Sequence, residues 1–536
     1  MEKRTLLAVA VTALFLLTYP ILLQKLGILR PQTEKAPQQN ANTQPYSATS
    51  PELPNGSKSA LPVLSSADKE TLSIQQDWIR LVISSQTGSV QEIHLNRFKD
   101  FAHGDPLRFF WAQEGGVGWI QSAPGVTVQG PLEIRQVSNQ SAEAKATLSN
   151  GLQWTQQCQL RPDQPAWEWT ITWYNPTAQP IRLEPLVWMA GQIQDLIHSQ
   201  DSRYVEVDAL SQEGKLYRRW AHKLNQSQTR FQGPIEWIGW KGKYFSLLMA
   251  SSTKAQEVIA ARTAHGEIQT GIVLGTRDIA PREEFQEKLL FYAGPNNTEL
   301  LAEVHQGMEK IVASGFLASI GQVLLAILNW FYQLVHSYGI AIILLTLFVN
   351  LILFPLTAKS MKSMRDLQKL QPKLKKMQET YKSNPQKLNK EMVELYRTHR
   401  VNPLGGCLPM VLQMPVFFAL YQTLGRSIEL RGAPFLWIQD LSGPDAIWKL
   451  PWGLPFLGNT INLLPILMIL AMWWQQRLST KTVLATAPAD DPQRMMAHLM
   501  PIMFGFVFYN LPSGLVLYWL TNTLLMALYQ FQITKT

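Results

Sequence analysis

The sequence predicts a multi-pass α-helical membrane protein with six spans and a large β-sandwich domain outside the membrane. Three observations support this prediction. Uncharged apolar runs gather at the start of the chain and in its C-terminal part. The region between them alternates apolar and polar residues over short segments, which is the period of a half-buried strand. One basic stretch carries most of the net charge of +9, and basic loops of membrane proteins favour the cytoplasm.

Length and composition limit the kinds of protein this can be. At 536 residues the chain is too long for one ordinary domain. Its two cysteines, Cys158 and Cys407, fall in different predicted compartments, so we expect no intrachain disulfide and no cysteine metal site. No stretch resembles a nucleotide-binding loop, a zinc motif or a nucleophile elbow. We therefore expect no catalytic residue, no metal and no cofactor, and a protein that is not an enzyme.

The N-terminal region predicts a membrane anchor followed by a tether. The run Thr5–Leu23 carries no charge and follows Lys3 and Arg4, and about 20 apolar residues cross the hydrocarbon core. A cleaved signal peptide is the alternative, but it would end at a small-x-small site, which the following residues lack. We expect an uncleaved anchor in residues 1–30 with a cytoplasmic N-terminus. Residues 31–70 are rich in Pro, Gln, Asn and Ser and predict a disordered linker.

Residues 71–296 predict the β-sandwich. In Trp167–Tyr174 three tryptophans and an isoleucine alternate with polar residues, as in a strand with one buried face. Many similar short runs are separated by Gly, Pro or Asn, which favours a sandwich. A parallel α/β domain would need helical segments between the strands. Exposed tryptophans would be typical of a carbohydrate or peptide site, but core aromatics are the commoner explanation.

Residues 297–337 predict connecting and interfacial helices. Asn297–Ala313 has apolar residues on one helical face, and the uncharged Phe316–His336 follows. The latter could be a span. However, Tyr338–Leu356 follows almost at once, and two crossings would place the basic loop on the same side as the β domain, which the distribution of basic residues disfavours. We therefore expect Phe316–His336 to lie flat on the outer membrane surface.

Residues 338–536 predict the remaining five spans and a basic helical hairpin. Tyr338–Leu356 runs inward and ends at Pro355, and Thr346 and Asn350 lie four apart on one face of it. Between Thr357 and Asn402, twelve basic residues stand against four acidic ones. This stretch predicts a hairpin in residues 358–401 made of Lys359–Glu379 and Gln386–Arg397, and its most prominent cations are Lys359, Lys362, Arg365, Lys373, Lys375 and Lys376.

The charge of the hairpin has several interpretations. It could only fix the orientation of the protein and contact anionic lipids, or it could dock a partner or an incoming substrate. Nucleic acid is another partner for basic residues, but a basic loop between apolar helices is more simply a topology signal. We expect no direct contact with nucleic acid, and the first two interpretations stay open.

The next segment, Asn402–Tyr421, begins with a Pro- and Gly-rich breaker and continues as an apolar helix. That helix contains Pro409, Pro415 and the amide Gln413. Lipid offers no hydrogen bonds, so such breaks persist only where neighbouring groups satisfy the backbone. The segment predicts an outward span, followed by a tryptophan-bearing outer loop. The last three spans are expected at Thr460–Trp474, Ala497–Leu511 and Leu515–Ile533, with both termini in the cytoplasm.

Uncharged polar residues recur at membrane depth in three of these spans. They are Thr346 and Asn350, then Gln413, then Thr521 with Asn522. Interhelical hydrogen bonds of about 0.6–2 kcal/mol would explain any one of them. Their recurrence in a small, proline-broken bundle favours a shared wet recess. No charged residue lies centrally in a span, and no inverted repeat is visible, which argues against an ion-coupled carrier.

Several motifs carry a resemblance to a known family. Val401–Tyr421 (VNPLGGCLPMVLQMPVFFALY), Ser427–Trp437 (SIELRGAPFLW) and Leu511–Trp519 (LPSGLVLYW) closely resemble the YidC membrane protein insertases. TLFVNLILFPLT before the hairpin and IEWIGWKGKYF in the β region add to the likeness. The family also holds the mitochondrial and chloroplast insertases, and the resemblance extends from the N-terminal anchor to the last helix.

The resemblance implies a catalyst of membrane insertion with a five-helix core in the bacterial inner membrane and its large domain in the periplasm. In the family a groove that is open to the cytoplasm and to lipid but closed outside receives the polar end of a nascent span, and the hairpin recruits or hands over the substrate. The implied partners are nascent membrane proteins, ribosome–nascent chain complexes, the secretion translocon and anionic lipids, and the protein also works alone. The groove residues implied here are Thr346, Asn350, Gln413, Tyr518, Thr521 and Asn522.

One position departs from the family. The usual groove arginine aligns with Asn350, so a buried cation that attracts acidic substrate tails is missing at this position. Two other classes of function compete with the insertase interpretation. A channel or carrier predicts an ionisable or symmetric midplane site, which is not visible. A surface receptor built on the β domain leaves the basic hairpin and the polar spans without a role.

Overall fold

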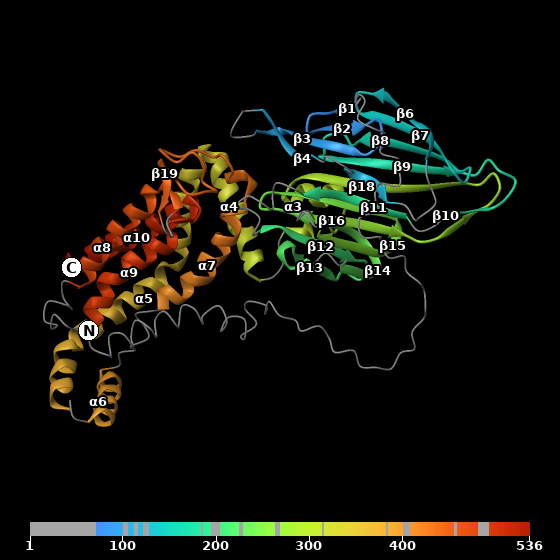
Figure 1. Cartoon of the computed structure of the whole chain (residues 1–536). Helices are drawn as coiled ribbons and strands as arrows, with labels where there is room; N and C mark the ends of the chain where they lie inside the picture. Colours follow the sequence, from blue (N-terminus) through green and yellow to red (C-terminus); the bar gives the residue numbers. More distant parts are fainter. Residues whose placement is uncertain are drawn as a thin grey trace, which may run out of the picture. The chain divides into compact units, whose positions relative to one another are not determined.

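The computed structural model describes residues 71–99, 105–111, 116–121, 128–183, 186–193, 204–224, 229–262, 268–312, 316–381, 384–399, 408–454, 458–480 and 492–535. The chain divides into two compact units, and Figure 1 labels many of their helices and strands. The β unit comprises Ser50–Ser319 and Arg426–Gly432, and the helical unit comprises Met1–Thr49, Ile320–Gly425 and Ala433–Thr536. The anchor expected in residues 1–30 and the linker expected in residues 31–70 lie outside the described residues.

The β unit is built from strands with short helical segments. Its strands are β1 (Thr71–Gln75), β2 (Ile79–Ser84), β3 (Val90–Lys99), β4 (Pro106–Trp111), β5 (Val117–Gln121), β6 (Val128–Ser138), β7 (Ser141–Leu148), β8 (Gln153–Leu160), β9 (Ala166–Tyr174), β10 (Ile181–Leu183), β11 (Leu186–Ile193), β12 (Glu206–Ser211), β13 (Leu216–Trp220), β14 (Thr229–Lys241), β15 (Phe245–Arg262), β16 (Ile268–Leu274), β17 (Arg277–Ile279) and β18 (Glu284–Pro295). Its helical segments are η2 (Ala221–Lys223), α3 (Thr298–Val304), η3 (Met308–Ile311) and η5 (Ile428–Leu430).

Two sheets share one bent hairpin, β14–β15. The first half of β15, Phe245–Ser251, pairs with β18, and its second half, Glu257–Arg262, pairs with β16. The register of β14 against β15 shifts twice between Gln232 and Trp237, and such bulges bend a strand. One branch continues from β18 through β9, β8 and β7 to β6, and the other continues from β16 through β11, β5, β3 and β2 to β1.

The two branches face each other across an aromatic core, so the unit is a β-sandwich. Gly118 of β5 lies so close to Trp169 of β9 that a Cβ atom there would fall 1.5 Å from the indole ring. Trp167, Trp169, Ile171 and Trp173 are all buried. The alternation predicted for this strand is therefore confirmed, and these tryptophans belong to the core rather than to a surface site.

The segment after β18 packs onto the sheet through apolar side chains. Leu301 and Val304 of α3 and Met308 and Ile311 of η3 are buried against residues of β12, β14, β15 and β18 such as Trp237. Asn297 caps α3 by accepting a hydrogen bond from the amide of Leu300 at 2.9 Å. The segment that the sequence assigns to a connector is thus part of the packed β unit.

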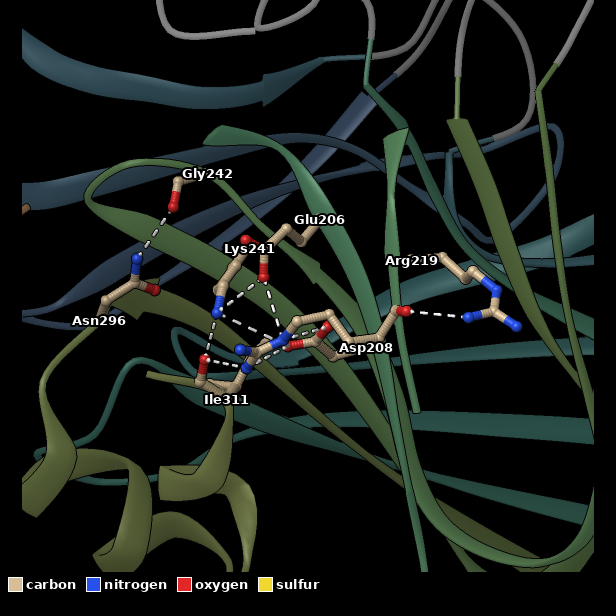
Figure 2. A network of polar contacts seen from close by, with 8 residues as sticks. Glu206, Asp208, Arg219, Lys241, Gly242, Asn296 and Ile311 are labelled. Carbon is tan, nitrogen blue, oxygen red and sulfur yellow. Dashed lines mark hydrogen bonds and ion pairs between the residues drawn. The ribbon is translucent and has the colours of Figure 1, made fainter. Parts of the chain in front are cut away.

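A buried ionic network holds the end of η3, as Figure 2 shows. Lys241 Nζ donates to the carbonyl oxygen of Ile311 at 2.5 Å and pairs with Glu206 at 3.1 Å and Asp208 at 3.6 Å. Arg218 pairs with the same two carboxylates at 3.1 Å and donates to the Ile311 carbonyl at 3.3 Å. Burial lowers the pKa of Lys241 and raises the pKa of Asp208, so each charge depends on its partners to stay ionised.

The end of α3 is held in the same way. Arg161 donates to the carbonyl oxygen of Val304 at 2.8 Å and pairs with Glu168. The last carbonyls of a helix lack intrahelical partners, and a cation there also meets the negative end of the helix dipole. Both helical segments of the connector therefore end at cations of the β unit.

The helical unit contains seven α-helices among the described residues. They are α4 (Phe316–Val335), α5 (Tyr338–Thr380), α6 (Pro385–Thr398), α7 (Leu408–Leu424), α8 (Leu463–Thr480), α9 (Pro492–Phe508) and α10 (Ser513–Lys535), and β19 (Trp448–Leu454) pairs with β20 (Gly458–Ile461). In this part of the chain α4 and the Tyr338–Ser360 stretch of α5 are long and apolar enough to span a membrane. The surface placement of Phe316–His336 stays a prediction.

The helix of the predicted first core span does not end at Pro355, as expected, because α5 runs unbroken from Tyr338 to Thr380. Proline removes one backbone donor, but the helical patterns on both sides of it continue the same helix. Transmembrane helices tolerate such a proline where other groups compensate. Pro355 removes the helical donor for the carbonyl oxygen of Leu351, four residues earlier, and the Thr357 hydroxyl bonds instead to the carbonyl oxygen of Leu353 at 3.0 Å. The first arm of the hairpin is thus a direct extension of the helix that contains the predicted span.

The later helices also differ from the predicted borders. The span predicted at Thr460–Trp474 corresponds to α8, which begins at Leu463 and ends at Thr480. The other two begin earlier than predicted, α9 at Pro492 and α10 at Ser513. The helices are longer at most ends because polar residues can continue a helix beyond its apolar stretch, where hydropathy no longer marks the border. The breaker at residues 402–407 lies outside the described residues.

Candidate functional site

Thr346 and Asn350 form a buried polar pair on α5. Both lie on one face, and Thr346 is fully buried while Asn350 is 5% exposed. Thr346 donates its hydroxyl hydrogen to the carbonyl oxygen of Ile342 at 2.7 Å, and Asn350 donates from its amide to the carbonyl oxygen of Thr346 at 2.8 Å. The helix itself thus provides acceptors for these donors, which is the usual solution for a threonine in a buried helix.

Gln413 and Tyr518 link two other helices. The side-chain amide of Gln413 in α7 donates to the hydroxyl oxygen of Tyr518 in α10. Tyr518 is fully buried and Gln413 is half-buried. A hydrogen bond between side chains of different helices fixes their register, which apolar packing alone does less well.

Thr521 and Asn522 continue the polar face of α10 by one turn. Thr521 donates its hydroxyl hydrogen to the carbonyl oxygen of Leu517 at 2.8 Å. The amide oxygen of Asn522 is buried and has no hydrogen-bond partner among the described residues. An unpartnered buried acceptor costs free energy, so this atom is a place where water or a passing donor would be stabilised.

Packing places these groups at one level of three neighbouring helices. Ile342 of α5 contacts the start of α10 at Gly514, and Phe354 packs on Tyr529 with ring centroids 5.4 Å apart. The two helices therefore run in parallel, and Thr346 and Asn350 lie between those contacts, as do Tyr518, Thr521 and Asn522. Within the described residues no hydrogen bond joins the α5 pair to α7 or α10. Whether water fills the space between them stays a prediction.

The sequence did not single out the aromatic residues that flank this polar level. Trp519 packs on Phe417, Phe504 and Phe508, with ring centroids 5.1–5.9 Å apart. They join α7, α9 and α10 into one wall beside the Gln413–Tyr518 hydrogen bond. Apolar residues in a transmembrane helix are so common that sequence alone could not distinguish this wall from a lipid-facing surface.

The hairpin consists of the end of α5 and all of α6. Lys359, Lys362, Lys373 and Lys376 are exposed on α5, whereas the side chains of Arg365 and Lys375 lie outside the described residues. The second arm begins at Asn384, whose side chain accepts a hydrogen bond from the amide of Lys387 at 3.1 Å. Lys373 Nζ lies 3.0 Å from His399 Nε2 and joins the two arms.

Comparison with known proteins identifies the family. The profile described as YidC periplasmic domain matches residues 71–327, and the profile described as 60Kd inner membrane protein matches residues 330–536. A membrane protein insertase YidC of Pelobacter propionicus is 30% identical over 100% of this chain and 99% of its own length. This chain belongs to the YidC family of membrane protein insertases.

Another YidC relative is more similar, but over only part of the chain. The protein of Endomicrobium trichonymphae is 43% identical over 46% of this chain and 45% of its own length. A crystal structure of an active YidC insertase with the first transmembrane domain resolved covers 87% of this chain and 93% of its own, at 18% identity and a TM-score of 0.38. That structural likeness is too low to add to the family assignment. The two matching profiles indicate an inner-membrane protein with a periplasmic domain.

Proposed function

We propose that this YidC-family protein moves nascent transmembrane segments from the cytoplasm into the inner membrane through a polar recess between α5, α7 and α10. The observation that carries the proposal is the level at which these three helices place uncharged polar groups, with the amide oxygen of Asn522 left unpartnered among the described residues. The hydrogen bond between Gln413 and Tyr518 fixes two walls of the recess. The exposed apolar residues of α5, such as Leu347 and Leu351, give the substrate a route into lipid.

The recess lowers the barrier to insertion by replacing water around the polar end of the substrate. A charged side chain at the bilayer centre costs about 2.5–3.5 kcal/mol on insertion scales and more in simulations. Hydroxyls and amides at mid-depth, together with the water they hold, would offset part of that free-energy cost. The described apolar stretches of α5, α7 and α10 contain no charged residue, so we propose that hydration rather than charge attraction performs this step.

We propose six spans with both termini in the cytoplasm. The anchor in residues 1–30, the Tyr338–Ser360 part of α5, and α7, α8, α9 and α10 are the crossings, and α4 lies on the outer surface. The exposed Phe316, Val323, Trp330 and Leu334 of α4 recur at helical spacing, which supports an interfacial helix. The loops before α5, after α7 and between α9 and α10 are then outer loops.

We propose that the basic hairpin receives the substrate. Its exposed lysines would attract anionic lipid head groups and the ribosome–nascent chain complex. The continuity of α5 from Tyr338 to Thr380 supports this role, because one helix joins the receiving arm to the polar level at Thr346 and Asn350. The secretion translocon is a further proposed partner, and the insertase is proposed to work with it or alone.

The test removes the polar groups and measures insertion. Asn350→Leu combined with Gln413→Leu dries two walls of the recess, and we expect insertion in proteoliposomes to fall about tenfold or more, the loss that corresponds to about 1.4 kcal/mol. Asn350→Arg should be tolerated and should favour substrates with acidic translocated tails. The assay is protease protection of a substrate tail, with and without its carboxylates.

A control variant separates the loss of polar groups in the recess from general damage to the packing of the helices. Leu420→Met of α7, a buried apolar position, changes packing without removing a polar group and should insert normally. Full activity of the double leucine variant, in protein that reaches the membrane at the wild-type level, would exclude the hydrated recess.

A further inference from the structure

The threonine hydroxyls of the polar recess have already used their hydrogens. Thr346 of α5 and Thr521 of α10 each donate the hydroxyl hydrogen to a backbone carbonyl of their own helix, at 2.7 and 2.8 Å. A hydroxyl group carries one hydrogen and two lone pairs. The oxygen is therefore what each threonine can still offer to a substrate, and it can only accept a hydrogen bond.

The side-chain amides of Asn350 and Gln413 are oriented in the same sense. The amide nitrogen of Asn350 donates to the carbonyl oxygen of Thr346 at 2.8 Å, and that of Gln413 donates to the hydroxyl oxygen of Tyr518. The nitrogen and the oxygen of an amide lie on different sides of its carbon atom, so these bonds turn the nitrogen toward the helices and the oxygen away from the acceptor. Neither oxygen accepts a hydrogen bond from a described residue.

Asn522 adds a further oxygen on α10. The residue is half-buried, and its amide oxygen is buried without a donor among the described residues. A buried acceptor without a donor has lost its water and gained nothing in exchange. A donor that enters the recess would therefore gain more at this oxygen than at one that water already reaches.

Donors also remain in the recess, but no cation accompanies them. The hydroxyl hydrogen of Tyr518 and the other amide hydrogens belong to neutral groups that carry an oxygen as well. Neither α7 nor residues 338–356 of α5 contain Lys, Arg or His, and the only such residue of α10 is Lys535 at its end. A carboxylate, which has oxygens and no hydrogen, would find few free donors here, whereas an ammonium group would find free oxygens on three helices.

The free oxygens belong to five side chains, those of Thr346, Asn350, Gln413, Thr521 and Asn522. We propose that the recess favours substrate tails that carry ammonium groups over tails that carry carboxylates, and that Asn522 is a specificity-determining residue for this choice. The inference rests on the proposed function. Hydrogen bonds to a charged group are stronger than those between neutral groups, so an ammonium group gains most from these oxygens while it crosses the bilayer.

The test compares substrates that differ only in the translocated tail. One single-span substrate carries either lysines or aspartates at the same tail positions, and these two side chains cost about the same on insertion scales. Insertion by the full chain in proteoliposomes is followed by protease protection, without a membrane potential, because a potential would act on the charge of the tail. The rate in empty liposomes is subtracted for each tail. We expect the lysine tail to insert about tenfold faster than the aspartate tail.

Removing the buried oxygen should reduce this preference. Asn522→Leu keeps a side chain of similar size, and we expect the ratio of the lysine rate to the aspartate rate to fall about fivefold, which corresponds to about 1 kcal/mol. Thr521→Val removes one hydroxyl oxygen and should lower the ratio less, and it gives the answer if Asn522→Leu fails to reach the membrane. Leu528→Met is the control, because Leu528 is an exposed apolar residue of the same helix, and its ratio should equal that of the unchanged protein.

The outcomes separate this inference from the proposed function. If neither tail inserts faster than in empty liposomes, the protein does not catalyse insertion and both proposals are overturned. If both tails insert faster but the aspartate tail equals or exceeds the lysine tail, the preference alone is overturned. A ratio that stays the same in Asn522→Leu and Thr521→Val, or that falls equally in Leu528→Met, would overturn the role of the recess oxygens and leave the insertase function intact.

Discussion

The β unit buries Lys241 with Glu206 and Asp208 beside the half-buried Arg218, whereas α5, α7 and α10 place hydroxyls and amides at one level. In the β unit each charge has an opposite charge within 3.6 Å, and the network ends on a backbone carbonyl. In the helical unit Thr346 and Asn350 bond to their own helix, and the amide oxygen of Asn522 lacks a partner within the described residues. The ionic network of the β unit fixes the connector in place. In the helical unit, the amide oxygen of Asn522 can still accept a hydrogen bond from another group.

This difference predicts opposite responses to mutation. Removing one charge from a paired buried network leaves its partners uncompensated, which costs several kcal/mol of stability. Removing a hydroxyl that bonds only to its own helix costs little stability, because the backbone hydrogen bond of that turn persists. Changes in the β unit should therefore reduce stability more than activity, and changes at the polar level of the helical unit should do the reverse.

The largest effect is expected when the β domain is deleted, and it should depend on the residue at which the deletion ends. The sequence suggests a cut before Asn297, but Leu301, Val304, Met308 and Ile311 are buried against the sheets. Each would be exposed at a cost of roughly 1.5–3 kcal/mol. A chain that lacks residues 71–296 should aggregate, whereas one that lacks residues 71–312 should reach the membrane and insert substrate, since no residue of the proposed recess lies in the β unit.

The measurements are the yield in the membrane fraction and protease protection of a substrate tail. The two deletions differ only in residues 297–312, so each is the control for the other. Equal yield of both would show that the connector does not need the sheets. Loss of insertion in the shorter chain at normal yield would show that the β domain takes part in the reaction.

A large effect is also expected from Lys241→Met. The variant leaves Glu206 and Asp208 with Arg218 alone and takes one donor from the Ile311 carbonyl, so the β unit should lose about 3–5 kcal/mol of stability. Cys158 is buried in the core of this unit, and its labelling rate in the full-length protein follows the open population. We expect that rate to rise roughly 100-fold or more, at tenfold for each 1.4 kcal/mol.

Lys288→Met is the matched control for this variant. Lys288 is exposed on β18, and exposed substitutions usually change stability by no more than about 0.5 kcal/mol. Substrate insertion by Lys241→Met at low temperature, where the unit stays folded, should be near normal. A Lys241→Met protein as stable as Lys288→Met would contradict the view that the network holds the connector.

The sequence predicted the two regions to different extents. The strand at Trp167–Tyr174 could be recognised because its alternation of apolar and polar residues lies within eight consecutive residues. The polar groups at Thr346 and Gln413 could be recognised because lipid-exposed spans rarely carry them. The ionic network could not, because strand pairing brings β12, β13 and β14 together and these residues are ordinary surface types in sequence.

The smallest change in structure should come from Thr346→Val. Comparing it with Thr357→Val separates an effect on activity from an effect on stability most sharply. Each hydroxyl donates to the carbonyl four residues earlier in α5, at 2.7 Å for Thr346 and 3.0 Å for Thr357. Each side chain is at most 6% exposed, and valine nearly preserves its volume. Both variants should shift the stability of the helical unit by no more than about 1 kcal/mol, the usual size of such a bond in a membrane helix.

The two variants should differ in activity. Thr346 lies at the level of Tyr518 and Thr521, whereas Thr357 lies about three turns farther along α5, toward the hairpin. Insertion should therefore fall several-fold in Thr346→Val and stay unchanged in Thr357→Val, and thermal unfolding in detergent should show the two proteins to be equally stable. Equal activity would mean that the Thr346 hydroxyl serves its helix alone. A large and selective loss of stability in Thr346→Val would mean that the polar side chains of the helical unit stabilise its fold, as the charges of the ionic network stabilise the β unit.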